Sequence, residues 1–287
     1  MARYAAEADI EDRESGAVLR CHLRANLGDL APGDRVQWQR NERGAGVVSG
    51  VLPRTSEFRR PDKFGNVRLV AANITRACIT LAKAPAPHAS LLDRYLVVAE
   101  HFEFEPLLVL NKSDLLAPGD PIGELLQIYK DLGYDSCTVS AECAAGLEEL
   151  QSYLQEGISL FVGQSGVGKS SLLQRLLPDE VLRVGALSEQ VAKGRHTTTQ
   201  ARLYHFPGGG SCIDSPGIRE FGLWHLTQPQ IAAGFCEFRP HLGQCRFRDC
   251  RHVKEPSCTI LAAVEAGEIR TDRHASYCAM LTETGRE

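Results

Sequence analysis

The sequence lacks an excess of positive charge, because 32 lysines and arginines stand against 36 aspartates and glutamates, for a net charge of −4. This balance argues against nucleic-acid binding through overall charge, so any contact with RNA must come from local patches. No apolar run is long enough to cross a bilayer, and the first residues, Met1 to Gly16, are acidic and polar, unlike a signal peptide. We therefore expect a cytoplasmic protein with no membrane partner.

The chain of 287 residues is long enough for two or three domains with a sizeable core. Its ten cysteines, in a cytosolic protein, indicate metal ligation and buried thiols rather than disulfides.

The clearest motif follows an expected buried strand at residues 158–162 and precedes a helical pattern that starts near Ser171. It is Gly163-x4-Gly168-Lys169-Ser170, the signature of a phosphate-binding loop. Its glycines let backbone N–H groups curl around a phosphate, and the following helix directs its positive dipole end at the same anion. An ordinary glycine-rich turn is the alternative, which the flanking strand and helix disfavour. The predicted nucleotide-binding residues here are Gly163, Gln164, Ser165, Gly166, Val167, Gly168, Lys169, Ser170 and Ser171, with Lys169 on the β/γ-phosphates and Ser170 on Mg²⁺.

A second motif lies upstream, in a segment whose apolar runs at 76–81 and 106–110 predict parallel strands and whose segments 91–102 and 121–132 predict helices. The second of these strands leads directly into Asn111-Lys112-Ser113-Asp114. A carboxylate at Asp114 accepts hydrogen bonds from N1–H and the 2-amino group of guanine, whereas adenine would leave that charge unpaired. Alone, this pattern also occurs in helix-capping turns.

Another short strand ends at Thr138-Val139-Ser140-Ala141, where Ser140 and Ala141 are placed to present a backbone N–H to guanine O6. Together with the phosphate loop, these motifs predict GTP rather than ATP as the ligand.

Two further segments are expected to meet the γ-phosphate. Residues 186–199 resemble a switch, and one of their threonines, which we take as Thr198, is expected to contact Mg²⁺. Asp214-Ser215-Pro216-Gly217 follows the next strand, so Asp214 is expected to hold the Mg²⁺ hydration shell and the Gly217 N–H to sense the γ-phosphate. Many GTPases have a glutamine directly after this motif, but here Ile218 can neither donate nor accept a hydrogen bond.

Slow intrinsic hydrolysis is therefore expected, with Lys169 and Thr198 as catalytic residues and His196 as the candidate that positions the attacking water. A His196 that only contacts rRNA or solvent is an equal alternative.

The first 65 residues show strand-like alternation, as at Leu19, Cys21 and Leu23, and predict a small OB-like β-barrel. Exposed arginines on such a barrel suit RNA, although they are equally expected on a solvated face. Residues 54–63 are polar and predict a linker.

The C-terminal part contains Cys245-x4-Cys250-x-His252-x5-Cys258, a Cys₃His set that suits one tetrahedral structural Zn²⁺. Buried thiols beside a chance histidine are the alternative. The remaining cysteines are expected in the core. Ser257 is expected to cap a helix over 258–267, and Asp272 a second helix that ends near Thr284. The same stretch carries a local basic patch and a candidate RNA surface, at Arg239, Arg246, Arg248, Arg251 and Lys254.

The nucleotide motifs stand in an unusual order, because the two base-reading motifs precede the phosphate loop. An OB-like start, a permuted GTPase centre and this cysteine–histidine ending together resemble the RsgA (YjeQ) family of circularly permuted GTPases. Matching stretches include 33–36, 93–95, 194–199 and 219–222.

The resemblance implies an α/β P-loop GTPase domain at 66–226, between an OB-fold barrel at 1–65 and a mostly helical zinc-binding domain at 227–287. It also implies a monomeric hydrolase that cycles between GTP and GDP, binds the small (30S) ribosomal subunit and its 16S rRNA late in assembly, and is stimulated by that particle. A GTP-responsive rRNA-binding scaffold and an ATP-using P-loop protein are the alternatives.

Overall fold

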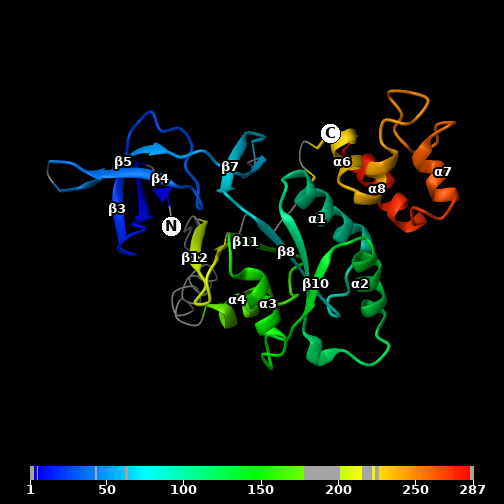
Figure 1. The fold of residues 1–287 in the computed structure, drawn as a ribbon, viewed down its shortest axis with the longest axis horizontal. Coiled ribbons are helices and arrows are strands. Elements are labelled where there is room, and N and C mark those ends of the chain that lie inside the picture. Colours follow the sequence, from blue (N-terminus) through cyan, green and yellow to red (C-terminus); the bar gives the residue numbers. More distant parts are fainter. Residues whose placement is uncertain are drawn as a thin grey trace.

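The computed structural model describes residues 3–4, 6–42, 44–61, 64–177, 201–214, 222–223 and 226–284. Three parts lie in a row, with the N-terminal strands at one end, a larger sheet in the centre and the C-terminal helices at the other end (Figure 1). Among the described residues, no helix is both long enough and apolar enough to cross a membrane.

The N-terminal part is a five-stranded sheet in the order β1-β2-β3-β5-β4. Neighbouring strands are antiparallel except β3 and β5, which are parallel, and this pattern fits the partly open Greek-key barrel of the OB type. Its small core contains the fully buried side chains of Val48 and of Cys21, which belongs to the alternation seen in the sequence. The strands are β1 (Arg3–Tyr4), β2 (Glu7–Glu11), β3 (Val18–Leu23), β4 (Val36–Arg40) and β5 (Gly46–Val51).

The prediction of a linker at 54–63 is wrong for part of that segment. Strand β6 (Glu57–Pro61) pairs antiparallel with β7 (Val67–Ala72). Phe58 is fully buried, with its ring centroid 5.3 Å from that of Phe102 at the end of the next helix. Because charged residues flank Phe58, no apolar pattern in the sequence indicated this strand.

The central sheet has the order β10-β9-β8-β11-β13-β12, and all its strands are parallel except the edge strand β12. The strands at its centre are nearly all apolar because helices cover both faces. The predicted strands at 76–81, 106–110 and 158–162 are confirmed. The observed bounds are β8 (Arg76–Ala82), β9 (Glu105–Asn111), β10 (Asp135–Thr138), β11 (Ile158–Val162), β12 (Arg202–His205) and β13 (Ser211–Asp214).

Two pairs of helices cover the two faces of this sheet. α1 (Ala89–His101) and α2 (Pro121–Asp131) share one hydrophobic cluster with it, and α3 (Leu147–Leu154) and α4 (Lys169–Leu176) share the other. Asp120 caps α2 by accepting a hydrogen bond from the Ile122 N–H, and Pro121 occupies the first turn. The two helices predicted here are confirmed.

The C-terminal part contains α6 (Gln228–Ala233), the 3₁₀ segment η3 (Cys236–His241), α7 (Thr259–Glu265) and α8 (Thr271–Thr284). Both predicted helices are present, but the expected Ser257 cap is wrong. Cys258 is the N-cap of α7, and no side chain caps it there.

A buried ion-pair network joins this part to the central domain. Arg273 of α8 donates to Asp93 of α1 at 2.6 Å and to both carboxylate oxygens of Glu237 at 2.6 and 2.9 Å. The guanidinium also stacks over the Phe235 ring, 4.6 Å from its centroid, and Tyr129 donates its hydroxyl to Asp93. Burial alone would raise the pKa of Glu237, but the hydrogen bonds and charge of Arg273 outweigh it and lower that pKa. The network thus fixes α8 on α1.

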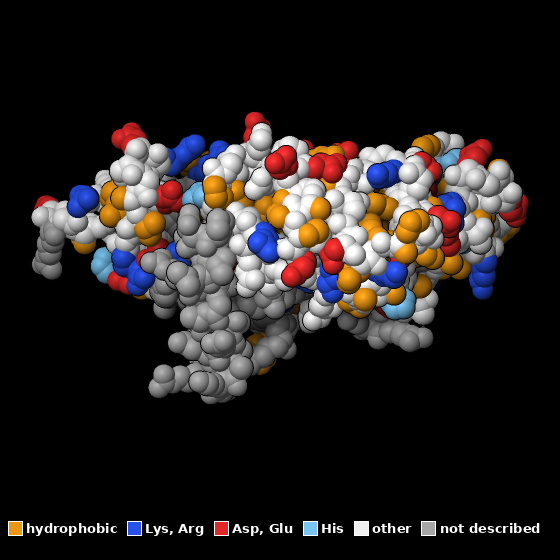
Figure 2. Space-filling model, turned by 90° about the horizontal axis from the view of Figure 1, so that it is seen from below, with side chains coloured by type: hydrophobic (Ala, Val, Ile, Leu, Met, Phe, Trp, Pro, Cys, Tyr) orange, Lys and Arg blue, Asp and Glu red, His pale blue; other side chains and the backbone are white. Residues whose placement is uncertain are grey.

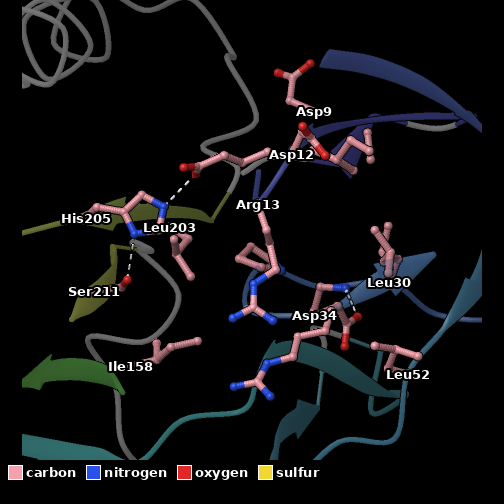
Figure 3. Close-up of a pocket in the computed structure, with 18 of the residues that line it drawn as sticks. Asp9, Asp12, Arg13, Leu30, Asp34, Leu52, Ile158, Leu203, His205 and Ser211 are labelled. Atoms are coloured by element: carbon pink, nitrogen blue, oxygen red, sulfur yellow. Dashed lines mark hydrogen bonds and ion pairs between the residues drawn. The ribbon is translucent and has the colours of Figure 1, made fainter. Parts of the chain in front are cut away.

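At the other end, the N-terminal sheet meets the central sheet around a cavity of about 690 Å³. Figure 3 shows Arg13 directed into it, and Leu30 and Leu52 face Ile158 and Leu203 across it.

One imidazole bridges the two sheets at this cavity. His205 of β12 contacts Glu11 of β2 through Nε2 at 2.6 Å and Ser211 of β13 through Nδ1 at 2.8 Å (Figure 3). The N-terminal sheet is therefore bonded to the edge hairpin of the central sheet.

Candidate functional site

The predicted site residues gather at one edge of the central sheet. Strands β9, β10, β11 and β13 are parallel, so their carboxyl ends meet there, which is where α/β sheets bind ligands. Asn111 ends β9, Ser140 follows β10, Gly163 follows β11 and Asp214 ends β13.

The phosphate-loop glycines have conformations that other residues rarely adopt. Gly163 has φ +139° and Gly168 has φ +94°. A Cβ on Gly163 would lie 2.2 Å from the Thr80 carbonyl oxygen, and one on Gly168 would lie 2.3 Å from the side-chain amide nitrogen of Asn111. Both positions therefore require glycine.

The ammonium group of Lys169 lies over this loop. Its Nζ donates hydrogen bonds to the carbonyls of Gly163 and Gln164, each at 2.6 Å. Val167 is buried, whereas Ser165, Gly166, Ser170 and Ser171 are exposed at the loop and the first turn of α4. The loop and the first turn of α4 thus combine a cation with exposed serine residues.

Asn111 and Lys112 connect the base-reading motif to the phosphate loop. Asn111 is 1% exposed, and its Nδ2 donates to the Val167 carbonyl at 2.9 Å. Lys112 is left-handed at φ +61°, and its Nζ donates to the carbonyls of Gly166 at 2.7 Å and Ala84 at 2.8 Å. Two segments more than fifty positions apart in the chain are therefore held together.

Asp114 lies in the short 3₁₀ segment η1 (Ser113–Leu115). The buried Ser140 hydroxyl donates to its carboxylate. The Ala141 N–H, in the segment expected to present a backbone N–H to guanine O6, donates to Asn111 Oδ1 at 3.1 Å. Hydrogen bonds between protein groups thus hold the two base-reading loops together as one unit.

One residue of this unit was not predicted. Arg175, in the last turn of α4, donates to the carbonyl of Ala141 at 2.8 Å and to that of Glu142 at 2.9 Å. No sequence signal distinguishes it from an ordinary basic residue at a helix C-terminus.

Three other predicted residues, His196, Thr198 and Gly217, lie outside the described residues.

The Cys₃His set forms a compact cluster away from this edge. The ligand atoms of Cys245, Cys250, His252 and Cys258 all lie within 4.8 Å of one another. Cys245 Sγ is 3.8 Å from Cys258 Sγ, and each is 3.4 Å from His252 Nδ1. A tetrahedral metal with bonds of about 2.3 Å to sulfur requires sulfur–sulfur distances of about 3.8 Å. These residues therefore fit a metal ion.

The surroundings of His252 favour the neutral form of its imidazole. His274 contacts the His252 backbone carbonyl through Nε2 at 2.7 Å, and burial lowers the pKa of His252. A neutral imidazole is the form that binds a metal.

The expectation that the other cysteines are core residues holds for Cys21, Cys78, Cys137 and Cys212, which are buried. It is wrong for Cys143, which is exposed beside Ser140, and Cys236 and Cys278 are half-buried. Cys143 is a single apolar residue in a loop, where no periodicity indicates burial. A hydrogen bond with Ser140 lowers the pKa of the Cys143 thiol.

The basic residues near the cluster differ in their partners. Arg239 pairs with Glu100 at 2.6 Å. Among the described residues, the side chains of Arg246, Arg248, Arg251 and Lys254 form no ion pair, and Arg246 lies over the exposed Phe247 ring. On the face shown in Figure 2, basic and acidic side chains are interspersed.

Similarity to known proteins covers nearly the whole chain. A family model described as RsgA GTPase matches residues 51–224. The small ribosomal subunit biogenesis GTPase RsgA of Azotobacter vinelandii is 56% identical over 274 residues, which is 94% of this chain and 80% of the relative. The protein of that name from Ectopseudomonas mendocina is 52% identical over 282 residues, which is 96% and 82% of the two chains.

Two solved structures resemble the fold. YjeQ from Thermotoga maritima has a TM-score of 0.81 and 34% identity, with 98% of this chain and 95% of that chain covered. YloQ, described as a circularly permuted GTPase, has a TM-score of 0.76 and 27% identity, with 100% and 94% covered. The chain therefore belongs to the RsgA GTPase family.

Proposed function

We propose that this chain hydrolyses GTP during biogenesis of the small ribosomal subunit, binding the 30S particle and 16S rRNA, and that its nucleotide state times its release. The observation that carries this proposal is the contact of Asn111 and Lys112 with the Val167 and Gly166 carbonyls. These hydrogen bonds hold the guanine-reading motif against the phosphate loop, so that one pocket can hold both ends of a GTP molecule.

Within this pocket each residue has a separate task. Asp114, oriented by Ser140, accepts hydrogen bonds from guanine. Lys169 exchanges its two carbonyl partners for the β- and γ-phosphates, because its ammonium group binds a charged phosphate more strongly than a neutral carbonyl. Ser170 and Asp214 are the residues that would hold Mg²⁺, which neutralises charge that develops on the phosphates.

Catalysis requires a group that orients the attacking water, and we assign this task to His196, with Thr198 at Mg²⁺ and the γ-phosphate. Replacing His196 with alanine should reduce subunit-stimulated hydrolysis while GTP affinity is unchanged. Equal stimulated rates in the variant and the parent would remove His196 from the mechanism.

The cluster of Cys245, Cys250, His252 and Cys258 is proposed to hold one structural Zn²⁺, because three thiolates and one imidazole are the ligands of closed zinc sites. The adjacent side chains of Arg246, Arg248, Arg251 and Lys254, together with the N-terminal barrel, are proposed as the rRNA-binding surfaces.

We further propose a division into domains at 1–65, 66–226 and 227–287, a cytoplasmic location and a monomeric state. The β6–β7 ribbon crosses the first of these boundaries.

The proposal is tested by measuring GTP hydrolysis with and without purified 30S subunits. Stimulation by the particle supports a hydrolysis-timed assembly factor, whereas binding to 30S without stimulation favours the alternative, a GTP-responsive scaffold. Competition of ATP against GTP on the same protein is the control, and equal competition would refute the guanine site.

A further inference from the structure

We infer that the cavity between the N-terminal sheet and the central sheet is a binding site for a small amphipathic anion, meaning one carboxylate or phosphate group joined to an apolar body. Its volume of about 690 Å³ lies within the range of about 300–1,000 Å³ that is typical of small-molecule sites. The lining includes Ile158 and Ser211, which begin β11 and β13, whereas the nucleotide motifs follow the ends of these strands. The cavity is therefore separate from the proposed GTP site.

Both sheets contribute apolar side chains to the walls of this cavity. Leu30 and Leu52 lie on one wall and face Ile158 and Leu203 on the other (Figure 3). Ile158 and Leu203 are only half-buried, and Leu52 is 39% exposed. Trp38 of β4 adds a half-buried aromatic ring to the lining. An apolar body between these walls would remove apolar surface of both sheets from water, which is favourable.

The carboxylates that line the cavity are mostly engaged by other protein groups, so they leave little negative charge to attract a cation. The exposed Glu14 is the exception among the described residues. The engaged pairs are Asp9 with Arg20, Glu11 with His205, Asp12 with Ser15, and Asp34 with Arg54.

Two guanidinium groups of the lining, those of Arg13 and Arg35, are not engaged in this way. Among the described residues, neither side chain forms a hydrogen bond or an ion pair. Figure 3 shows Arg13 directed into the cavity. A guanidinium presents paired N–H donors that match the oxygens of a carboxylate or phosphate. Positive charge without a counterion beside apolar walls therefore indicates a ligand with an anionic head and an apolar body.

The test uses the fluorescent dye anilinonaphthalene sulfonate, which joins an anionic group to an aromatic body. Its dissociation constant is measured on the full chain, with and without saturating GDP. Arg13→Met and Arg35→Met keep much of the aliphatic stem and remove the charge and the donors. Leu52→Asp places a carboxylate on the apolar wall at an exposed position. Arg24→Met is the matched control, because Arg24 is exposed on the same N-terminal part and does not line the cavity.

Each arginine variant should weaken dye binding roughly fivefold, which is the effect of one hydrogen-bonded contact, and L52D should weaken it at least as much. R24M should stay within about twofold of the parent. GDP should leave the dye affinity unchanged. Octanoate and octyl phosphate should displace the dye at concentrations at which octanol does not, and the stronger of the two competitors identifies the preferred head group.

Unchanged dye affinity in both R13M and R35M would overturn the inference, as would an equal loss in R24M. Displacement by GDP would place the dye in the nucleotide site, and displacement by octanol as effective as that by octanoate would show an apolar patch that does not recognise anions; either result overturns the inference. A short oligonucleotide that displaces the dye where octyl phosphate does not would assign the two arginines to RNA and overturn it too. Far-UV circular dichroism of each variant confirms that it is folded.

Discussion

Replacing Arg273 with methionine should destabilise the packing of the C-terminal helices on the central domain. The side chain of Arg273 is 3% exposed and those of its partners Asp93 and Glu237 are 1% and 9% exposed. Methionine retains the volume of the stem but leaves two buried carboxylates without their cation. Losing one member of a buried ion pair costs about 3–5 kcal/mol. One oxygen of Asp93 already has no partner within the described residues, so little local compensation is available.

The assay is urea denaturation of the full chain, followed by far-UV circular dichroism. Arg270→Met is the matched control, because Arg270 lies close to the same helix and pairs with Asp272 while both side chains are 52% exposed. This exposed pair should contribute less than about 1 kcal/mol. If R273M and R270M lower the free energy of unfolding equally, the buried network does not hold the two parts together.

The pH dependence gives a second readout of the same network. The pKa of Glu237 lies below its ordinary value of 4.5 in the folded chain. Its carboxylate therefore contributes stability above pH 4.5, and this contribution is lost as the pH falls through the folded pKa. The difference in stability between parent and R273M should shrink as the pH is lowered below 4.5. A difference that stays constant across this range would exclude Glu237 as the partner that matters.

Three further predictions concern the sites. Gly168→Ala places a Cβ against the side-chain amide of Asn111 and should weaken GTP binding by more than about tenfold. Gly123→Ala, with open space around it, should bind GTP normally and slightly raise the free energy of unfolding. Asp114→Asn replaces an acceptor with a donor, so GTP affinity should fall on the order of a hundredfold and xanthosine triphosphate, with a 2-oxygen, should compete better than GTP. Cys258→Ser should abolish bound zinc measured by atomic absorption and lower the thermal midpoint, while Cys278→Ser should retain the metal; retention in both would refute the ligand set.

Local patterns predicted the parts of this chain that depend on neighbouring residues. The strands that carry the motifs are continuous apolar runs, and each motif begins where such a run ends, so Asn111, Gly163 and Asp214 could be assigned to one sheet edge before any coordinates. The four residues of the Cys₃His set are also close in sequence, so their spacing predicted that their ligand atoms lie together.

The missed features depend on partners that are remote in sequence. Arg273 and Asp93 are 180 positions apart, and the Arg175 contact with Ala141 spans 34 positions, so neither leaves a periodic signal. Strand β6 was missed because Phe58 is its one fully buried side chain among charged neighbours. In each case a tertiary contact, rather than the local sequence, determines the structure at that position.

The His205 bridge places the N-terminal sheet in contact with a strand that leads to the nucleotide site. Ser211, which His205 contacts, begins the same short strand that Asp214 ends, and that strand lies beside β11, from which the phosphate loop emerges. Glu11, His205 and Ser211 thus form a continuous set of contacts from the N-terminal sheet to the strand that ends at Asp214, where metal and phosphate would be bound.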